Sequence, residues 1–220
     1  MSSLANTIAS SDSAPRDGAP RVNRRQAAKI RTRGKVLDAA RTLFAERGYD
    51  PATIRDIARG ADMSTGAVFA NFQDKAELFE TVLTEDMERL ATNMIAGTTG
   101  DTVMARLVSA LNAGYYESID QLPLFQAIFA RGWFQPLEAE VRARAAMNGI
   151  LDHLNGILRK GVADGELKQD VDVPLLVEMV WTIFQSNYRH AAYQAWTMSD
   201  IDRQLTRQIS VLLAGSLTGR

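Results

Sequence analysis

The residues best suited to recognition chemistry form a run of small and hydroxyl side chains, Ser64-Thr65-Gly66-Ala67. Val68 and Phe72 follow at a spacing that predicts a short helix through about Asn71, with Ser64 as its N-cap. Small side chains let a helix backbone approach another surface, and hydroxyls can donate to bases or phosphates. We therefore interpret this helix start as a nucleic-acid contact rather than as core packing.

Basic side chains are concentrated just upstream of this run. Residues 21–35 contain no acid and seven basic residues: Arg21, Arg24, Arg25, Lys29, Arg31, Arg33 and Lys35. Residues 1–75 carry 13 basic and 8 acidic side chains, a net of +5, whereas the rest of the chain carries 12 and 18, a net of −6. A basic head on an acidic body indicates that one end meets a polyanion. The alternative is a solvated charge run with no partner.

The composition and motifs of the chain exclude several other kinds of functional site. The chain of 220 residues has no cysteine, which excludes disulfide, zinc–thiolate and iron–sulfur sites. Its two histidines, His153 and His190, lie far apart, and no phosphate-cradling glycine loop or G-x-S-x-G motif is present. The longest apolar stretch, 173–184, is interrupted by Glu178 and is shorter than the roughly 18 residues of a membrane span. We expect no enzyme activity, metal, cofactor or membrane contact.

Apolar periodicity predicts an all-α chain. A helix over 33–47 should end at Gly48, and Thr53 should cap a short second helix. Asp62 and Met63 form a turn before the helix that Ser64 caps. Longer helices are predicted from the cap at Asp74 to about 96, from a cap at Asp101 to about 118, and over 123–132, 136–161, 174–196 and 199–215.

The motifs of the first eighty residues resemble the DNA-binding domain of TetR-family transcriptional regulators. The matching stretches are Val36 to Phe44, Gly48-Tyr49, Thr53 to Ala58, Ser64 to Phe69, and Phe72, Lys75 and Leu78, with no gap in spacing. The resemblance implies an N-terminal three-helix helix-turn-helix domain plus a C-terminal helical bundle for ligand binding and dimerisation. It implies that the following residues contact DNA: Arg33, Thr53, Arg55, Ser64, Thr65, Gly66, Ala67, Phe69, Asn71 and Lys75.

Three positions depart from the usual family pattern. Phe69 replaces a tyrosine and cannot donate a hydrogen bond to phosphate. Asn71 replaces a histidine or tyrosine, but it can still donate or read adenine. Asp62 replaces a turn glycine, and aspartate tolerates the left-handed region well enough to keep the turn.

The chain divides into a tail, a DNA-binding domain and a larger helical domain. We expect residues 1–28 to be a disordered tail with a basic arm, 29–76 to be the helix-turn-helix domain, and 77–220 to bind ligand and dimerise. The tail lacks the features of a secretory signal, which fits a cytoplasmic protein. The basic arm could lie along the DNA backbone or in the adjacent minor groove.

The larger domain carries most of the aromatic side chains, a pattern that usually marks a core. The resemblance nevertheless implies a small-molecule pocket there, and bundle cavities are lined by such groups. The predicted pocket residues are Met94, Leu111, Tyr115, Phe129, Trp133, Leu151, Trp181, Phe184 and Tyr188. Gly149 and Gly156 share a helix face, where either close packing or a ligand would explain them.

These observations predict a ligand-responsive, homodimeric DNA-binding regulator, most simply a repressor of a near-palindromic operator. The effector would be small and largely apolar or aromatic. The resemblance implies that the last two helices pair across a two-fold axis, which doubles the contacts with DNA. Two alternatives stay open: a helical protein that sequesters a small molecule and keeps a vestigial DNA-binding head, and a helical enzyme that uses the same cavity.

Overall fold

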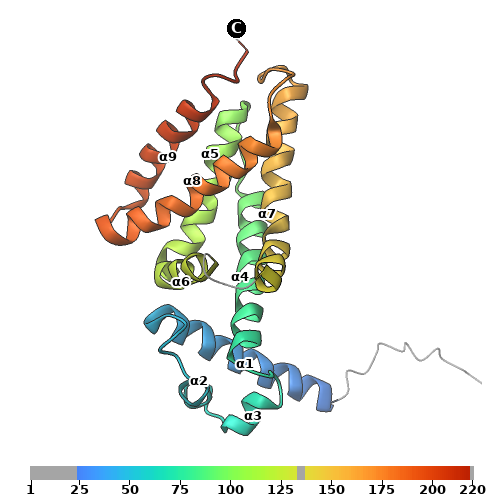
Figure 1. The fold of residues 1–220 in the computed structure, drawn as a ribbon, viewed down its shortest axis with the longest axis vertical. Helices are drawn as coiled ribbons and strands as arrows, with labels where there is room; N and C mark the ends of the chain where they lie inside the picture. Colours follow the sequence, from blue (N-terminus) through green and yellow to red (C-terminus); the bar gives the residue numbers. More distant parts are fainter. Residues whose placement is uncertain (1–23, 133–136, 219–220) are drawn as a thin grey trace, which may run out of the picture.

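The computed structural model describes residues 24–132 and 137–218 and is built from α-helices (Figure 1). Within these ranges the only β-pairing is an isolated bridge between Leu167 and Leu217. The all-α prediction is confirmed. The helices are α1 (Arg24–Arg47), α2 (Ile54–Gly60), α3 (Thr65–Phe69), α4 (Lys75–Ala96), α5 (Val103–Ser118), α6 (Leu122–Gly132), α7 (Leu137–Ala163), α8 (Val173–Gln194) and α9 (Met198–Leu213), with a 3₁₀ turn at Ile119–Gln121.

The helices α1, α2 and α3 form a small unit at one end of the molecule (Figure 1). Its core is made of fully buried apolar side chains, among them Val36, Phe44, Ile57 and Val68. The turns follow local chemistry: Gly48 after α1 has a φ of 78°, and Asp62 between α2 and α3 has a φ of 55°. Both are left-handed conformations, which glycine adopts freely and aspartate tolerates.

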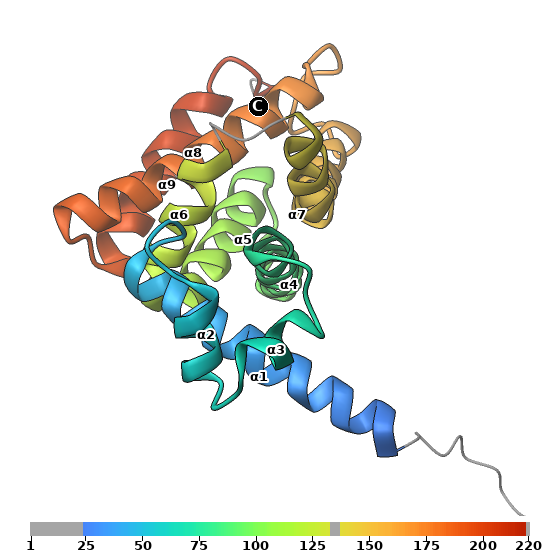
Figure 2. The ribbon, with the colours of Figure 1, turned by 60° about the horizontal axis from the view of Figure 1, so that its bottom comes forward.

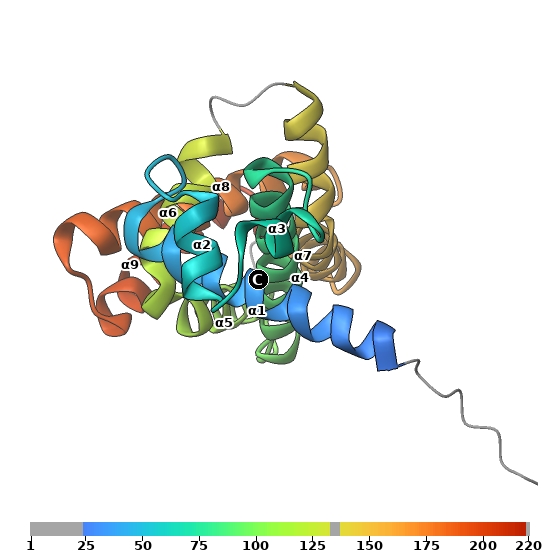
Figure 3. The ribbon, with the colours of Figure 1, turned by 90° about the horizontal axis from the view of Figure 1, so that it is seen from below.

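The helix α1 begins nine residues before the predicted start at residue 33. The turns from Gln26 to Lys35 carry good helix formers and contribute nothing to the buried core, which starts at Val36. They extend beyond the rest of the small unit as a single helix (Figures 2 and 3). The basic run is therefore largely helical, which the apolar periodicity could not predict. Residues 24–28, which were predicted to belong to the disordered tail, are helical. Residues 1–23 lie outside the described ranges, so that part of the tail stays a prediction.

The helix α4 joins the small unit to the larger one. Its N-cap is Asp74, whose side chain accepts from the backbone amide of Glu77, as predicted. Further along, α4 packs along both α5 and α7. A Cβ on Gly149 of α7 would lie 3.3 Å from Ala91 of α4, so this glycine permits close packing, whereas Gly156 faces open space. The cap of α5 is Thr102, not Asp101 as predicted.

The helices α8 and α9 lie at the end of the chain and pack against each other and the rest of the bundle (Figure 1). The amides of Asn187 on α8 and Gln208 on α9 exchange two hydrogen bonds, of 2.9 and 3.2 Å. Because Asn187 is fully buried, this reciprocal pair satisfies polar groups that would otherwise weaken the joint. Of the helices that lie within 24–132 and 137–218, none has the length and apolar character needed to cross a membrane.

Candidate functional site

The first turn of α3 is open to solvent, as a base-reading helix start requires. Thr65 and Gly66 are exposed and Ala67 is half-buried, while Val68 anchors the helix in the core. The hydroxyl of Ser64 accepts from the backbone amide of Ala67 at 3.2 Å, so Ser64 is the predicted N-cap. A Cβ on Gly66 would meet only the Ser64 hydroxyl, at 3.7 Å. The fold itself therefore does not require glycine at this position.

The last turn of α3 presents an apolar ring instead of a donor. Phe69 is 54% exposed, and it lies one turn after Thr65 on the same face. The side-chain amide of Asn71 donates to the carbonyl of Ala67 at 2.9 Å, and its Oδ1 is buried without a partner among the described residues. Asn71 thus closes the end of α3, and a contact between Asn71 and DNA would have to use its second amide N–H or replace this bond.

The start of α2 combines a predicted cap with a set of charges. The Thr53 hydroxyl accepts from the Asp56 amide at 3.2 Å and donates to the Asp56 carboxylate at 2.7 Å. This hydrogen bond, together with Arg59 at 3.3 Å and Arg47 at 4.0 Å, holds the pKa of Asp56 below its usual range. A phosphate contact from the Thr53 hydroxyl would compete with Asp56. Arg55 is exposed on the same helix.

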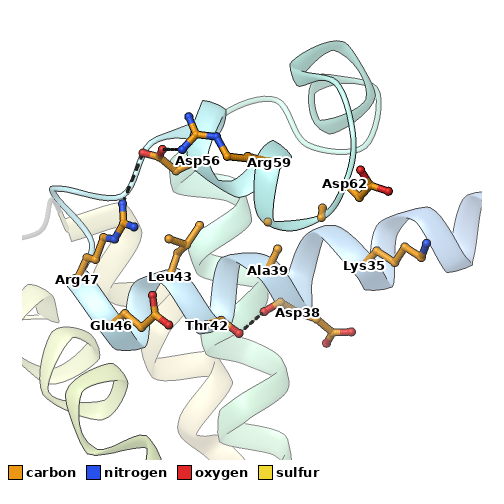
Figure 4. Close-up of a pocket in the computed structure, with 12 residues that line it drawn as sticks. Lys35, Asp38, Ala39, Thr42, Leu43, Glu46, Arg47, Asp56, Arg59 and Asp62 are labelled. Atoms are coloured by element: carbon orange, nitrogen blue, oxygen red, sulfur yellow. Dashed lines mark hydrogen bonds and ion pairs between the residues drawn. The ribbon is translucent and has the colours of Figure 1, made fainter.

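The charges around Asp56 border a groove of about 600 Å³ between α1 and α2 (Figure 4). Its walls carry both signs of charge, since Lys35, Asp38, Glu46 and Asp62 line it together with the two arginines that pair with Asp56. Acidic side chains on this side of α1 make it a poor surface for a polyanion.

Lys75 points into the protein rather than towards solvent. Its ammonium donates to the carbonyls of Tyr49, Asp50 and Ala52 at 3.0, 3.2 and 3.1 Å and lies 4.1 Å from the Tyr49 ring centre. An ammonium has three donors, and all three are engaged here. Lys75 therefore ties the α1–α2 loop to the start of α4, and its predicted contact with phosphate would require it to leave these carbonyls.

Arg33 is placed against the end of α3. Its guanidinium donates to the Asn71 carbonyl at 2.9 Å and lies over the Phe72 ring at 4.2 Å. This contact joins α1 to the end of α3 and sets which side of α1 faces α3. The predicted DNA residues thus divide into an exposed set (Thr53, Arg55, Ser64, Thr65, Gly66 and Phe69), a half-buried Ala67, and three that hold the unit together (Arg33, Asn71 and Lys75).

A buried carboxylate that the sequence reasoning missed lies where the small unit meets α4. Asp86 is 1% exposed, and its Oδ1 accepts from Arg41 Nε at 2.9 Å and from Arg89. Arg41 also donates to Asp38 and Glu85, each at 3.0 Å. Burial lowers the pKa of Arg41, but the three carboxylates outweigh burial and raise it. The sequence does indicate a buried charge here, because Asp86 interrupts the apolar face of α4 one turn from both Val82 and Leu90.

The predicted ligand residues converge in the larger unit as a packed cluster of rings. Tyr115 stacks on Phe184 at 4.5 Å, and Tyr188 contacts Phe129 at 5.4 Å; Trp181 reaches both Phe184 and Phe129. We call these five rings, together with Phe125, the ring cluster: Tyr115, Phe125, Phe129, Trp181, Phe184 and Tyr188. Phe125 was not among the predicted pocket residues, although it stacks on Tyr188 at 5.3 Å.

The other predicted pocket residues lie around these rings or outside the described residues. Met94 and Leu111 are fully buried in the same core, and Leu151 is half-buried. Trp133 lies outside the described residues.

The two tyrosines of the ring cluster use their hydroxyls internally. Tyr115 donates to the Phe184 carbonyl at 2.8 Å, and the Tyr188 hydroxyl pairs with Ser118. Burial raises the pKa of both hydroxyls, and the neighbouring Tyr188 adds to the effect on Tyr115. Both tyrosines therefore stay neutral at any physiological pH. The cluster can offer an incoming molecule large apolar faces and a few neutral hydroxyl groups, not a charge.

The histidines lie in separate surroundings. His153 on α7 is 2.6 Å from the Thr98 hydroxyl, and burial lowers its pKa. His190 on α8 stacks on Trp196 at 5.1 Å.

Comparison with known proteins agrees with this geometry. The family described as "Bacterial regulatory proteins, tetR family" matches residues 36–82, which run from the start of the buried part of α1 into α4. The repressor KstR2 of Rhodococcus jostii is 30% identical over 153 residues, which is 65% of this chain and 71% of that protein. The fatty acid metabolism regulator of Bacillus subtilis is 26% identical over 175 residues, covering 76% of this chain and 84% of the relative.

Solved structures share the whole architecture. The B. subtilis regulator FadR in complex with stearoyl-CoA has a TM-score of 0.72 at 20% identity, over 80% of this chain and 96% of that one. Salmonella enterica GusR has a TM-score of 0.70 at 26% identity, over 84% and 96%. The likeness extends well beyond residues 36–82 and includes the larger helical unit.

Proposed function

The chain belongs to the TetR family of bacterial regulatory proteins, and from this we propose that it is a homodimeric repressor that a small apolar effector releases from a near-palindromic operator. It is a DNA-binding transcriptional regulator, and the proposal assigns it regulation rather than catalysis. Its place of action would be the cytoplasm, where bacterial DNA lies.

The exposed first turn of α3 is the observation that carries the DNA-binding part of the proposal. Thr65 and Gly66 are exposed at the end of a helix whose opposite face, at Val68, is held in the core. A helix presented in this way can enter the major groove with its first residues against base edges. Arg55 and the backbone at the start of α2 lie nearby and would meet the sugar–phosphate backbone.

The exposed apolar side chains of α8 and α9 support dimerisation. Leu175 and Met179 lie one turn apart on α8 and are 50% and 44% exposed, and Val211 on α9 is 78% exposed. Pairing these helices with their copies would remove this apolar surface from water. A dimer would also place two copies of α3 at the spacing of roughly 34–36 Å that successive major grooves on one side of DNA require.

The ring cluster supports an apolar effector. Its six rings and neutral hydroxyls would accept a hydrocarbon or aromatic group between facing helices. The similar FadR structure holds stearoyl-CoA, and one relative is named a fatty acid metabolism regulator. We therefore choose stearoyl-CoA as the first molecule to test. Because the rings pack against one another in this structure, an effector would have to part them.

Gly66→Gln is the sharpest test of DNA binding, because the fold tolerates a side chain there while a base edge would not. Glutamine is also the better helix former, so the free energy of unfolding should not fall. An operator would first be selected from a randomised duplex pool with the unmodified protein. We expect Gly66→Gln to weaken binding to it roughly 10- to 100-fold, measured by fluorescence anisotropy.

Gly156→Gln is the matched control, since Gly156 lies on the exposed face of α7 with open space around its Cβ. This variant should bind the operator like the unmodified protein. If the unmodified chain selects no duplex, the alternative of a sequestering protein with a vestigial DNA-binding head is favoured. If both glycine variants bind the selected operator equally well, the first turn of α3 does not face the bases.

A further inference from the structure

The first three turns of α1 add little to the core beyond the contact of Arg33 with the Phe72 ring. Between Gln26 and Lys35 no apolar side chain is buried, and Ile30 is 62% exposed. Gly34 lies within these turns and contacts nothing through its Cβ position, and the first turn of α1 contains no acid that would favour a helix start. We call residues 24–35 the α1 extension.

We propose that the α1 extension is a rigid second DNA-contacting element, whose α3-facing side lies along the sugar–phosphate backbone flanking the bases that α3 reads. The inference rests on the proposed function, because it concerns the same duplex. It differs from a flexible arm in one respect: the helix fixes which basic side chains meet the phosphates.

Arg33 sets the rotation of the α1 extension. Because its guanidinium is bound to the Asn71 carbonyl and the Phe72 ring, the Arg33 side of α1 faces the end of α3. At 100° per residue, positions four and seven residues earlier share that side. These positions are Lys29 and Gln26, and both are exposed.

The opposite side of the same helix meets the groove between α1 and α2. Lys35 lines that groove together with Asp38 and Asp62 (Figure 4), and Arg31 lies one turn before Lys35 on that side. The two sides thus carry similar numbers of basic side chains. Asp38 and Asp62 lie on the groove side, where they would repel a polyanion.

Charge and direction identify the occupant as double-stranded DNA. The extension continues past α3 (Figure 3), so we place it beside a duplex that is seated on the exposed first turn of α3. Lys29 lies about 6 Å along the helix from Arg33, a distance of roughly two base-pair rises. With seven basic residues and no acid within residues 21–35, the segment is suited to phosphates rather than to base edges.

The test compares two charge-removing variants on opposite sides of the helix, Lys29→Gln and Arg31→Gln. Both positions are exposed and outside the core, so neither change should alter thermal unfolding. The readout is the slope of log Kd against log salt for the operator selected by the unmodified, full-length protein. We expect Lys29→Gln to reduce the slope by about 1 per protomer and Arg31→Gln to leave it almost unchanged.

A third variant separates a rigid helix from a flexible arm. One alanine inserted between Ile30 and Arg31 keeps every charge but turns Lys29 by about 100° away from the α3 side. A rigid extension predicts the same loss of slope as Lys29→Gln, whereas an unchanged slope would overturn the proposal. Equal effects of Lys29→Gln and Arg31→Gln would overturn it too. If the unmodified protein shows no salt-dependent duplex binding, the proposed function itself fails.

Discussion

At the scale of single residues, Phe69 stands where the family usually has a tyrosine, and the hydroxyl group of that tyrosine is missing. The exposed phenyl ring cannot donate to phosphate, but if α3 enters the major groove as proposed, the ring can pack against the C5-methyl group of thymine. Burying a group of methyl size contributes about 0.8 kcal/mol, roughly a fourfold change in affinity.

We therefore expect that replacing one thymine of a single operator half-site by uracil weakens binding by the unmodified protein roughly fourfold. The Phe69→Ala variant should bind the thymine and uracil duplexes equally, because the ring that contacts the methyl group is gone. Anisotropy titrations with a series of singly substituted duplexes would locate the thymine. Affinities unchanged at every thymine would show that Phe69 has no such contact.

Local chemistry made some residues predictable and tertiary contacts hid others. Gly48, Asp62 and Ser64 could be assigned because turn and cap requirements depend on the immediate neighbours in the chain. The three carbonyls that hold Lys75 lie 23 to 26 residues away in sequence, so no local pattern reveals them. Lys75→Ala would remove these bonds as well as any phosphate contact, and it is a poor test of DNA binding.

At the scale of elements, the same distinction decides the helix boundaries. Caps at Thr53 and Asp74 follow from residue type and spacing, and both are confirmed. The start of α1 could not be predicted in this way, because residues 24–35 lack an apolar stripe and hold their helical form as a continuation of the packed part of α1. Extending a helix from an existing turn costs less free energy than nucleating a new one. Such an extension needs no apolar stripe, so apolar periodicity cannot predict it.

The joint between α1 and α4 depends on Asp86, and this yields a stability prediction. Asp86→Ala would leave the half-buried guanidinium of Arg41 without its most buried partner. Breaking one side of a buried ion pair typically costs about 3–5 kcal/mol. We expect a loss near the lower end, about 3 kcal/mol of unfolding free energy, because Glu85 and Asp38 still pair with Arg41.

Urea unfolding followed by far-UV circular dichroism would measure this loss. The control is Lys160→Ala on α7, which removes an exposed pair with Asp164 and should cost less than about 1 kcal/mol. Equal losses in the two variants would mean that Asp86 does not hold the joint between α1 and α4.

At the scale of the whole molecule, the ring cluster and the DNA-binding unit are linked by a continuous path of contacts. Tyr188 pairs with Ser118 at the end of α5, and the adjacent Glu117 lies 3.7 Å from Arg89 of α4. Arg89 in turn shares Asp86 with Arg41 of α1. The helix α6, which carries Phe125 and Phe129, also packs on α1. An effector that parts the rings would therefore displace elements that support α1.

This path makes the coupling measurable. If stearoyl-CoA is an effector, it should quench tryptophan fluorescence saturably and weaken operator binding, since it must prefer the state that binds DNA poorly. Glu117→Gln removes the charge that faces Arg89 while leaving the ring cluster intact. In this variant stearoyl-CoA should bind with similar affinity. The ratio of the operator affinity without stearoyl-CoA to that with stearoyl-CoA should fall by several-fold, which lies within the usual 1–3 kcal/mol range of coupling energies. An unchanged ratio would mean that the signal reaches α1 through α6 and not through the Arg89–Asp86–Arg41 contacts.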